Sequence, residues 1–188
     1  MKKFVRTDDT IVQPVGIRFK KEVVIKRFTT EDGLTHEFTT WNREGARAGA
    51  VIALTADKKA IVIYQFRAGP ERWMYDIPGG GILTDEDAKD GVLRELREEA
   101  GYVPGNVEFL GTSSRDSINN ATWYYFLATD CTLLPEGPAL DKEEEEQGAE
   151  VRLISIEELL DNAKHDRMTD PVAVLMAYDK LKEIAAND

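Results

Sequence analysis

Short segments rich in β-branched and aromatic residues follow one another through the first third of the chain and predict antiparallel strands. Residues 23–28 and 34–41 flank a turn signal at 31–33, which together predict a hairpin. Residues 50–54 and 60–65, on either side of a turn at 56–58, predict a second hairpin. Further strands are predicted at residues 107–111, 122–128 and 151–154.

Three helices are predicted after the second hairpin. The first runs from about residue 86 to residue 100 and is stopped by Gly101. The second begins at Ser155, and the third begins at Pro171 behind the predicted N-cap Asp170. Strands dominate before the first helix and mix with helices after it, so the pattern predicts an α+β fold with mostly antiparallel pairing.

Composition narrows the classes of protein to consider. The 188 residues carry a formal net charge of −11, which argues against binding along a nucleic-acid backbone. The lone Cys131 fits a reducing compartment, and no charged-then-apolar leader or long apolar run is present, so we expect a cytoplasmic protein without membrane contact. The two histidines, His36 and His165, lie far apart in sequence and argue against a zinc site or a Ser-His-Asp relay.

The chemistry is expected where three consecutive glycines, residues 79–81, precede the first predicted helix. A glycine-rich loop lets backbone approach a ligand closely. On a helical wheel Glu95 and Glu99 share a face at the edge of the apolar stripe, with Glu98 next to them. Such carboxylates repel one another unless a cation joins them, and Mg²⁺ or Mn²⁺ suits an all-oxygen site. The alternative is a solvated helix face in which Arg94 and Glu98 form an ordinary i,i+4 pair.

The spacing of fixed residues in this segment resembles the Nudix box. The residues that carry the resemblance are Gly80, Glu86, Arg94, Glu95, Leu96, Glu98, Glu99, Gly101 and, at a position that is usually aliphatic, Tyr102. The resemblance implies the Nudix α/β/α sandwich with a mixed sheet, preceded by an N-terminal antiparallel β segment. It also implies a hydrolase that uses metal-assisted displacement at phosphorus.

The resemblance also implies roles for individual residues. The implied metal ligands are Glu95, Glu98, Glu99 and the carbonyl of Gly79, and the backbone at Gly80 is expected to approach the substrate. Arg94 would orient a glutamate, and Glu86 would anchor the loop to the helix or reach the metal through water. A plain scaffold salt bridge between Arg94 and Glu86 is the alternative.

Segments around the box resemble the ADP-ribose and nucleotide-sugar pyrophosphatases. They are residues 64–67 and 76–78, although Asp76 and Gly79 stand where that group usually has Glu and Ala, and residues 116–118 lack its proline. By analogy with this group, residues 1–45 would build a homodimer and close the nucleotide pocket of the partner subunit, and residues 46–188 would form the hydrolase domain. The implied substrate is a nucleoside diphosphate-linked molecule, ADP-ribose or a nucleotide sugar.

The remaining site predictions lie outside the box. In the acidic run at residues 141–146, Glu145 is the predicted general base, with Glu144 and Glu146 as alternatives. The non-functional alternative is a solvent-exposed acidic segment. Arg67 is predicted to contact phosphates, and Trp41 or Phe28 is predicted to stack on a base. The alternative for both aromatic residues is a role in the core or in the dimer interface. Rival functions are cleavage of nucleoside triphosphates or dinucleoside polyphosphates, and a non-catalytic nucleotide sensor.

Overall fold

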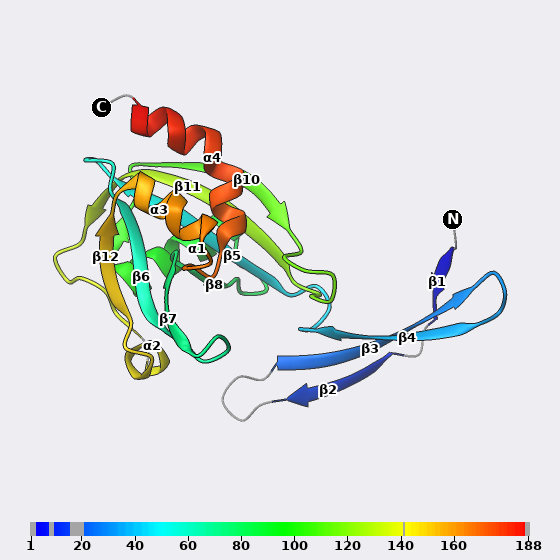
Figure 1. Cartoon of the computed structure of the whole chain (residues 1–188). Coiled ribbons are helices and arrows are strands. Elements are labelled where there is room, and N and C mark those ends of the chain that lie inside the picture. The colour runs from blue at the N-terminus through cyan, green and yellow to red at the C-terminus, as the bar shows by residue number, and fades with distance from the viewer. Residues whose placement is uncertain (1–2, 8–9, 16–20, 141, 187–188) are drawn as a thin grey trace. The chain divides into compact units, whose positions relative to one another are not determined.

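The chain folds into two compact units. The computed structural model describes residues 3–7, 10–15, 21–140 and 142–186, apart from the side chains of Lys21, Glu143 and Glu144. The N-terminal unit comprises residues 1–46 and 113–122, and the C-terminal unit comprises residues 47–112 and 123–188 (Figure 1). No feature of the sequence indicated that residues 113–122 belong with the N-terminal segment.

The N-terminal unit is built around one long strand. It contains β1 (Phe4–Arg6), β2 (Ile11–Val15), β3 (Lys21–Thr30) and β4 (Thr35–Trp41). Strand β3 pairs antiparallel with each of the other three, and its pairing with β4 confirms the predicted hairpin. The loop at 113–122 joins the unit through backbone, because the N–H of Trp41 donates to the carbonyl of Ile118 at 2.7 Å.

The C-terminal unit contains an eight-stranded sheet with the order β10-β11-β5-β6-β12, to which β7, β8 and β9 add at β6, β5 and β11. Its strands are β5 (Arg47–Thr55), β6 (Ala60–Arg67), β7 (Arg72–Asp76), β8 (Gly79–Gly81), β9 (Tyr102–Val103), β10 (Asn106–Ser113), β11 (Thr122–Leu133) and β12 (Glu150–Ile154). Its helices are α1 (Ala88–Glu95) with the π-helical turn η1 (Leu96–Ala100), α2 (Lys142–Glu146), α3 (Ile156–Lys164) and α4 (Pro171–Ala186).

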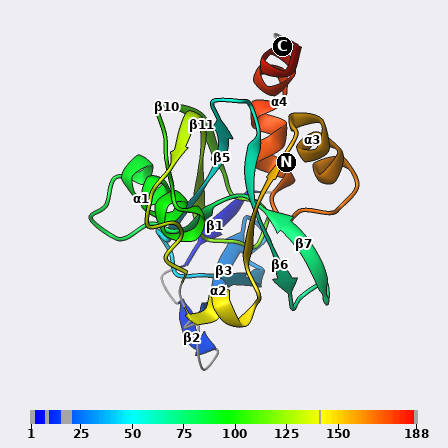
Figure 2. The ribbon, with the colours of Figure 1, turned by 90° about the vertical axis from the view of Figure 1, so that its left-hand side faces the viewer.

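Helices cover both faces of this sheet. Helix α1 lies on one side, and α3 and α4 lie on the other (Figure 2). Side chains of a strand alternate between faces, so Val51 and Ala53 pack in the cluster beneath α1, while Ile52 and Leu54 pack in the cluster beneath α3 and α4. Burial on both faces explains why β5 reads as a continuous apolar run. The predicted α+β class and α/β/α sandwich are therefore confirmed.

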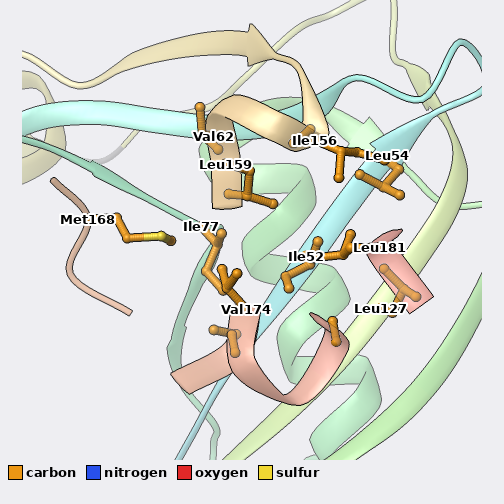
Figure 3. Close-up of a cluster of buried hydrophobic side chains, with 14 of the residues drawn as sticks. Ile52, Leu54, Val62, Ile77, Leu127, Ile156, Leu159, Met168, Val174 and Leu181 are labelled. Carbon is orange, nitrogen blue, oxygen red and sulfur yellow. The ribbon is translucent and has the colours of Figure 1, made fainter. Parts of the chain in front are cut away.

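The cluster beneath α3 and α4 is the larger of the two (Figure 3). Leu159 of α3 and Leu181 of α4 are fully buried in it and pack on the sheet. Ser155 caps α3 as predicted, because its hydroxyl oxygen accepts the N–H of Glu158 at 3.1 Å. This layer fixes the sheet from the side opposite α1.

Several predicted boundaries need correction. Helix α1 begins at Ala88 and not near residue 86, because the side chain of Asp87 caps it by accepting the N–H of Lys89. The acidic run was predicted as a loop, but residues Lys142–Glu146 form the short helix α2; Asp141 lies outside the described residues. In the part of the chain that the structure describes, no helix is long and apolar enough to span a membrane.

Candidate active site

The three glycines form a strand, which corrects the predicted loop. Gly79, Gly80 and Gly81 make up β8 and pair antiparallel with β5, with Gly49 opposite Gly80. Two box glutamates lie directly against this strand. A Cβ on Gly80 would sit 2.6 Å from Oε1 of Glu95, and the N–H of Gly79 donates to Oε2 of Glu99 at 2.9 Å. Glycine at residue 80 therefore makes room for a carboxylate.

Arg94 connects the remaining carboxylates of the box. Its Nε donates to Oε1 of Glu86 at 3.0 Å, and its Nη1 donates to both Glu95 and Glu98 at 2.9 Å. Its Nη2 donates to the carbonyl of Gly81 at 3.0 Å. One guanidinium thus ties the loop before α1, the helix itself and the glycine strand together, and the predicted contacts of Arg94 with box glutamates are present.

The four glutamates of the box and Arg94 together carry a net negative charge. Hydrogen bonds from Arg94 and from the N–H of Leu83 lower the pKa of Glu86, and Glu86 foremost raises the pKa of Arg94. Glu86, Glu95, Glu98 and Glu99 carry four negative charges against one positive charge on Arg94, which leaves a net charge of −3. Such a group of carboxylates favours a bound cation.

The last turn of the box helix is not a regular α-helix. Residues Leu96–Ala100 form a π-helical turn, which spreads Glu98 and Glu99 differently from the regular wheel on which the sequence was read. Gly101 ends the helix with φ of 76°, and its N–H donates to the carbonyl of Arg97 at 2.9 Å. The predicted stop at Gly101 is confirmed, while the π-helical turn was not foreseen.

The carboxylate oxygens at this site suit a divalent cation, but the described side chains do not form a complete coordination shell. Glu95 and Glu99 both present carboxylates to the same glycine strand, and hard oxygen donors are those that Mg²⁺ and Mn²⁺ prefer. Among the described residues, however, no three His, Cys, Asp or Glu side chains are gathered closely enough to hold a metal ion. Arg94 occupies carboxylate oxygens of Glu95 and Glu98 in this arrangement.

Arg67 lies at the end of β6, where its guanidinium forms an ion pair with Asp76 of β7. Asp76 therefore supports Arg67 although Glu is usual at this position of the group. The Nε of Arg67 and Oε1 of Gln65 are buried and have no hydrogen-bond partner within the described part of the chain. Both polar atoms come from alternate residues of β6, and buried polar atoms without a partner are uncommon in native proteins.

The other predicted residues lie elsewhere. Glu145 is exposed on α2, and its carbonyl accepts the N–H of Gly148 at 3.0 Å. Trp41 belongs to the N-terminal unit, where it is 43% exposed at the end of β4, and Phe28 packs with Phe38 of the same sheet. The roles of Glu145 and Trp41 stay predictions.

Sequence reasoning missed Arg47, the first residue of β5. Its Nη2 donates to the carbonyls of Leu83, Thr84 and Glu86, in the loop that leads into α1. A single arginine ahead of an apolar strand carries no distinctive pattern, so only the folded loop reveals this contact.

An α/β/α sandwich in which a glutamate-rich helix packs against a glycine strand is the arrangement expected of a Nudix hydrolase. Comparison with known proteins supports this assignment. The model of the NUDIX domain matches residues 45–174, and the chain belongs to the Nudix family. It is a Nudix hydrolase with pyrophosphohydrolase activity toward small nucleotide substrates, and hydrolases of this family generally use divalent metal ions.

Individual relatives give the degree of similarity. The chain is 31% identical to the ADP-ribose pyrophosphatase of Bacillus subtilis over 138 residues, which is 72% of this chain and 73% of that protein. It is 28% identical to the methanol dehydrogenase activator of Bacillus methanolicus over the same shares of each chain. An RNA pyrophosphohydrolase of Legionella pneumophila is 36% identical over 74 residues, 39% of this chain and 41% of that protein.

Solved structures show the same fold. The crystal structure of an ADP compounds hydrolase superposes with a TM-score of 0.73 at 18% identity, covering 96% of this chain and 95% of the other. A MutT structure from a study of Aliivibrio salmonicida and Vibrio cholerae gives a TM-score of 0.52 at 19% identity, over 71% of this chain and 98% of the other.

Proposed function

We propose that this Nudix hydrolase cleaves the diphosphate linkage of ADP-ribose or a nucleotide sugar and releases a nucleoside monophosphate and a sugar phosphate. Mg²⁺ is the proposed cofactor, and Mn²⁺ is expected to substitute for it. The observation that carries the proposal is the negative glutamate network braced by Arg94 against β8. The similarity to an ADP-ribose pyrophosphatase over 72% of the chain supports the substrate class.

Residues of the box are proposed to bind the cation and to orient its ligands. Glu95, Glu98, Glu99 and the carbonyl of Gly79 would hold the cation, which supplies charge neutralisation at the diphosphate and lowers the pKa of a bound water. Arg94 orients Glu95 and Glu98 through its Nη1, and Glu86 holds Arg94 through its Nε.

Substrate contacts and proton removal are assigned to residues outside the box. The unpaired Nε of Arg67 points to a hydrogen bond with a phosphate oxygen, and the Asp76 carboxylate keeps the guanidinium oriented for it. The backbone at Gly80 is proposed to approach the substrate, and Trp41 to stack on its base. Glu145 is proposed to accept the proton of the attacking water once substrate is bound.

The N-terminal unit offers a surface for a second copy of the chain. Phe4, Phe28 and Phe38 contact one another edge to face and line a small hollow of about 120 Å³, and Phe4 and Phe38 remain 47% and 46% exposed. Exposed apolar groups gathered in this way favour an interface. We propose a homodimer through residues 1–45, which would also close the substrate pocket of the partner subunit.

Substrate panels with coupled phosphate detection test the activity. ADP-ribose, nucleotide sugars, nucleoside triphosphates, dinucleoside polyphosphates and 5′-triphosphate RNA are each offered with Mg²⁺ or Mn²⁺, to the wild type and to Glu99→Gln. Turnover of ADP-ribose or a nucleotide sugar that Glu99→Gln abolishes supports the proposal. Preference for triphosphate ends, as the similarity to an RNA pyrophosphohydrolase permits, would replace the substrate class, and metal-dependent binding without turnover would indicate a sensor.

Sedimentation tests the dimer. The wild type is expected to sediment as a dimer, whereas Phe38→Ser and a chain lacking residues 1–43 are expected to sediment as monomers with reduced turnover. A fully active monomer without residues 1–43 contradicts both the dimer and its part in substrate closure.

A further inference from the structure

Arg47 places a positive charge at the centre of a small ring of backbone carbonyls. Its Nη2 lies 2.8 Å from the carbonyl oxygen of Thr84 and 2.9 Å from that of Glu86, and it also donates to the carbonyl of Leu83. The carbonyl of Arg47 in turn accepts the N–H of Ile82 at 3.0 Å. Main chain and side chain of one residue thus hold both ends of the loop between β8 and α1.

Three carbonyl oxygens that converge on one nitrogen indicate an electrostatic role. An Nη2 carries two N–H groups and cannot donate to three acceptors at full strength. Carbonyl dipoles directed at one point repel one another unless a cation sits there, and the guanidinium is always charged. The course of this loop therefore depends on the charge of Arg47 more than on any single hydrogen bond.

The loop held by Arg47 is the one that presents Glu86. The carboxylate of Glu86 accepts the N–H of Leu83 at 3.0 Å and the Nε of Arg94 at 3.0 Å, while the carbonyl of Glu86 accepts from Arg47. The main chain of Glu86 is fixed by one arginine and its side chain by another. If the loop shifts, the Glu86 carboxylate moves with it, and Arg94 loses the contact that orients it toward Glu95 and Glu98.

We propose that Arg47 is a positioning residue of the glutamate site, whose charge holds the loop before α1 so that Glu86 can fix Arg94. The proposal rests on the proposed metal-dependent hydrolysis. It predicts that loss of the charge weakens cation binding and lowers kcat, with little change in KM, because the Arg47 guanidinium donates to the backbone of the loop that presents Glu86.

The test compares Arg47→Ala, Arg47→Gln and Arg47→Lys in the full chain. Mn²⁺ affinity is measured by calorimetry, kcat and KM on the substrate selected by the panel, and thermal unfolding by circular dichroism. Arg47→Ala and Arg47→Gln are expected to lose about 10-fold or more in kcat and in Mn²⁺ affinity, since misplacement of a catalytic group by about 1 Å can cost about 100-fold. Arg47→Lys keeps a cation with three N–H donors and should retain most of both.

Chemical rescue and a matched control isolate the charge. Low millimolar guanidinium chloride, but not equal NaCl, should restore part of the Mn²⁺ affinity of Arg47→Ala. Arg72→Ala is the control, because Nη2 of Arg72 also holds a loop, through the carbonyl of Asp166 at 2.7 Å and its carboxylate, on the face of the sheet away from α1. Arg72→Ala should keep wild-type kcat and Mn²⁺ affinity.

The outcomes separate this inference from the proposed function. Wild-type Mn²⁺ affinity and kcat in Arg47→Gln, or a change in KM alone, would overturn the role of Arg47. If Arg47→Ala does not fold, the contrast between Arg47→Gln and Arg47→Lys decides. A wild type without turnover refutes the proposed function, and the Mn²⁺ affinities of the variants then decide the role of Arg47.

Discussion

Adding one methyl group at Gly80 should disable the site while leaving the fold intact, whereas the same change at Gly81 should disturb neither the site nor the fold. Both glycines belong to β8, and neither has the positive φ that would make alanine strained. They differ in what a Cβ would meet. At Gly80 it would lie 2.6 Å from Oε1 and 2.7 Å from Cδ of Glu95, whereas at Gly81 it would meet nothing within 4 Å.

The size of the effect follows from these distances. A Cβ–oxygen contact below 3.0 Å is not tolerated, so the Glu95 carboxylate must retreat by at least 0.4 Å, from 2.6 to 3.0 Å, in Gly80→Ala. The group that moves is the end of a flexible side chain, so the free energy of unfolding should stay within about 0.5 kcal/mol of wild type. A shift of this order in a group that is proposed to hold the cation should cost about 10- to 100-fold in kcat. Gly81→Ala should gain about 0.4–1 kcal/mol in stability from a less flexible unfolded chain.

Three measurements on both variants and the wild type check this expectation. They are turnover at saturating Mg²⁺, Mn²⁺ affinity by calorimetry, and stability by chemical denaturation. The reasoning is refuted if Gly80→Ala retains the kcat and Mn²⁺ affinity of Gly81→Ala, because Glu95 would then not need its position against β8. Unfolding of Gly80→Ala would show instead that the carboxylate cannot move aside and that the contact is part of the fold.

Three further predictions concern stability and reactivity. Leu159→Ala, at a fully buried position of α3, should lower the free energy of unfolding by about 2–5 kcal/mol, measured by denaturant titration, and a loss below 1 kcal/mol would contradict the packing. Burial raises the pKa of the Cys131 thiol to about 11, so at pH 8 Ellman's reagent should react far more slowly with the native protein than with the unfolded chain. Hydrogen bonds from Arg6 and Lys26 lower the pKa of Glu44 from 4.5 to about 2. Their stabilising effect is present above pH 4.5 and is lost as the pH falls toward 2, so wild type should lose more stability over that window than Glu44→Gln, and equal loss would refute the pairing.

The sequence predicted those elements whose side chains carry a pattern. The apolar run at residues 50–54 is the centre of β5, and Ser155 and Gly101 begin and end helices as their types suggest. Strand β8 escaped prediction because glycines have no side chain to show alternation and low intrinsic preference for strands. Pairing with β5 imposes the strand, and that pairing is a property of the whole sheet.

The same distinction holds within the site. Spacing alone predicted that Glu95 and Glu99 share a helix face, because residues four apart do so wherever the helix is regular, while the resemblance to the Nudix box implied their place beside the glycines. The π-helical turn alters that rule at Leu96–Ala100, and it depends on packing beneath the helix that no local pattern records. The contacts of Arg47 could not be predicted from the local sequence. Three carbonyls approach its side chain only when the loop from Ile82 to Glu86 lies against β5. The box pattern therefore indicates which carboxylates gather at the candidate site, whereas the contacts of Arg47 with the loop before α1 are visible only in the folded chain. If Arg47 acts as proposed, a chain with an intact box but no cation at this position would need another device to fix the loop.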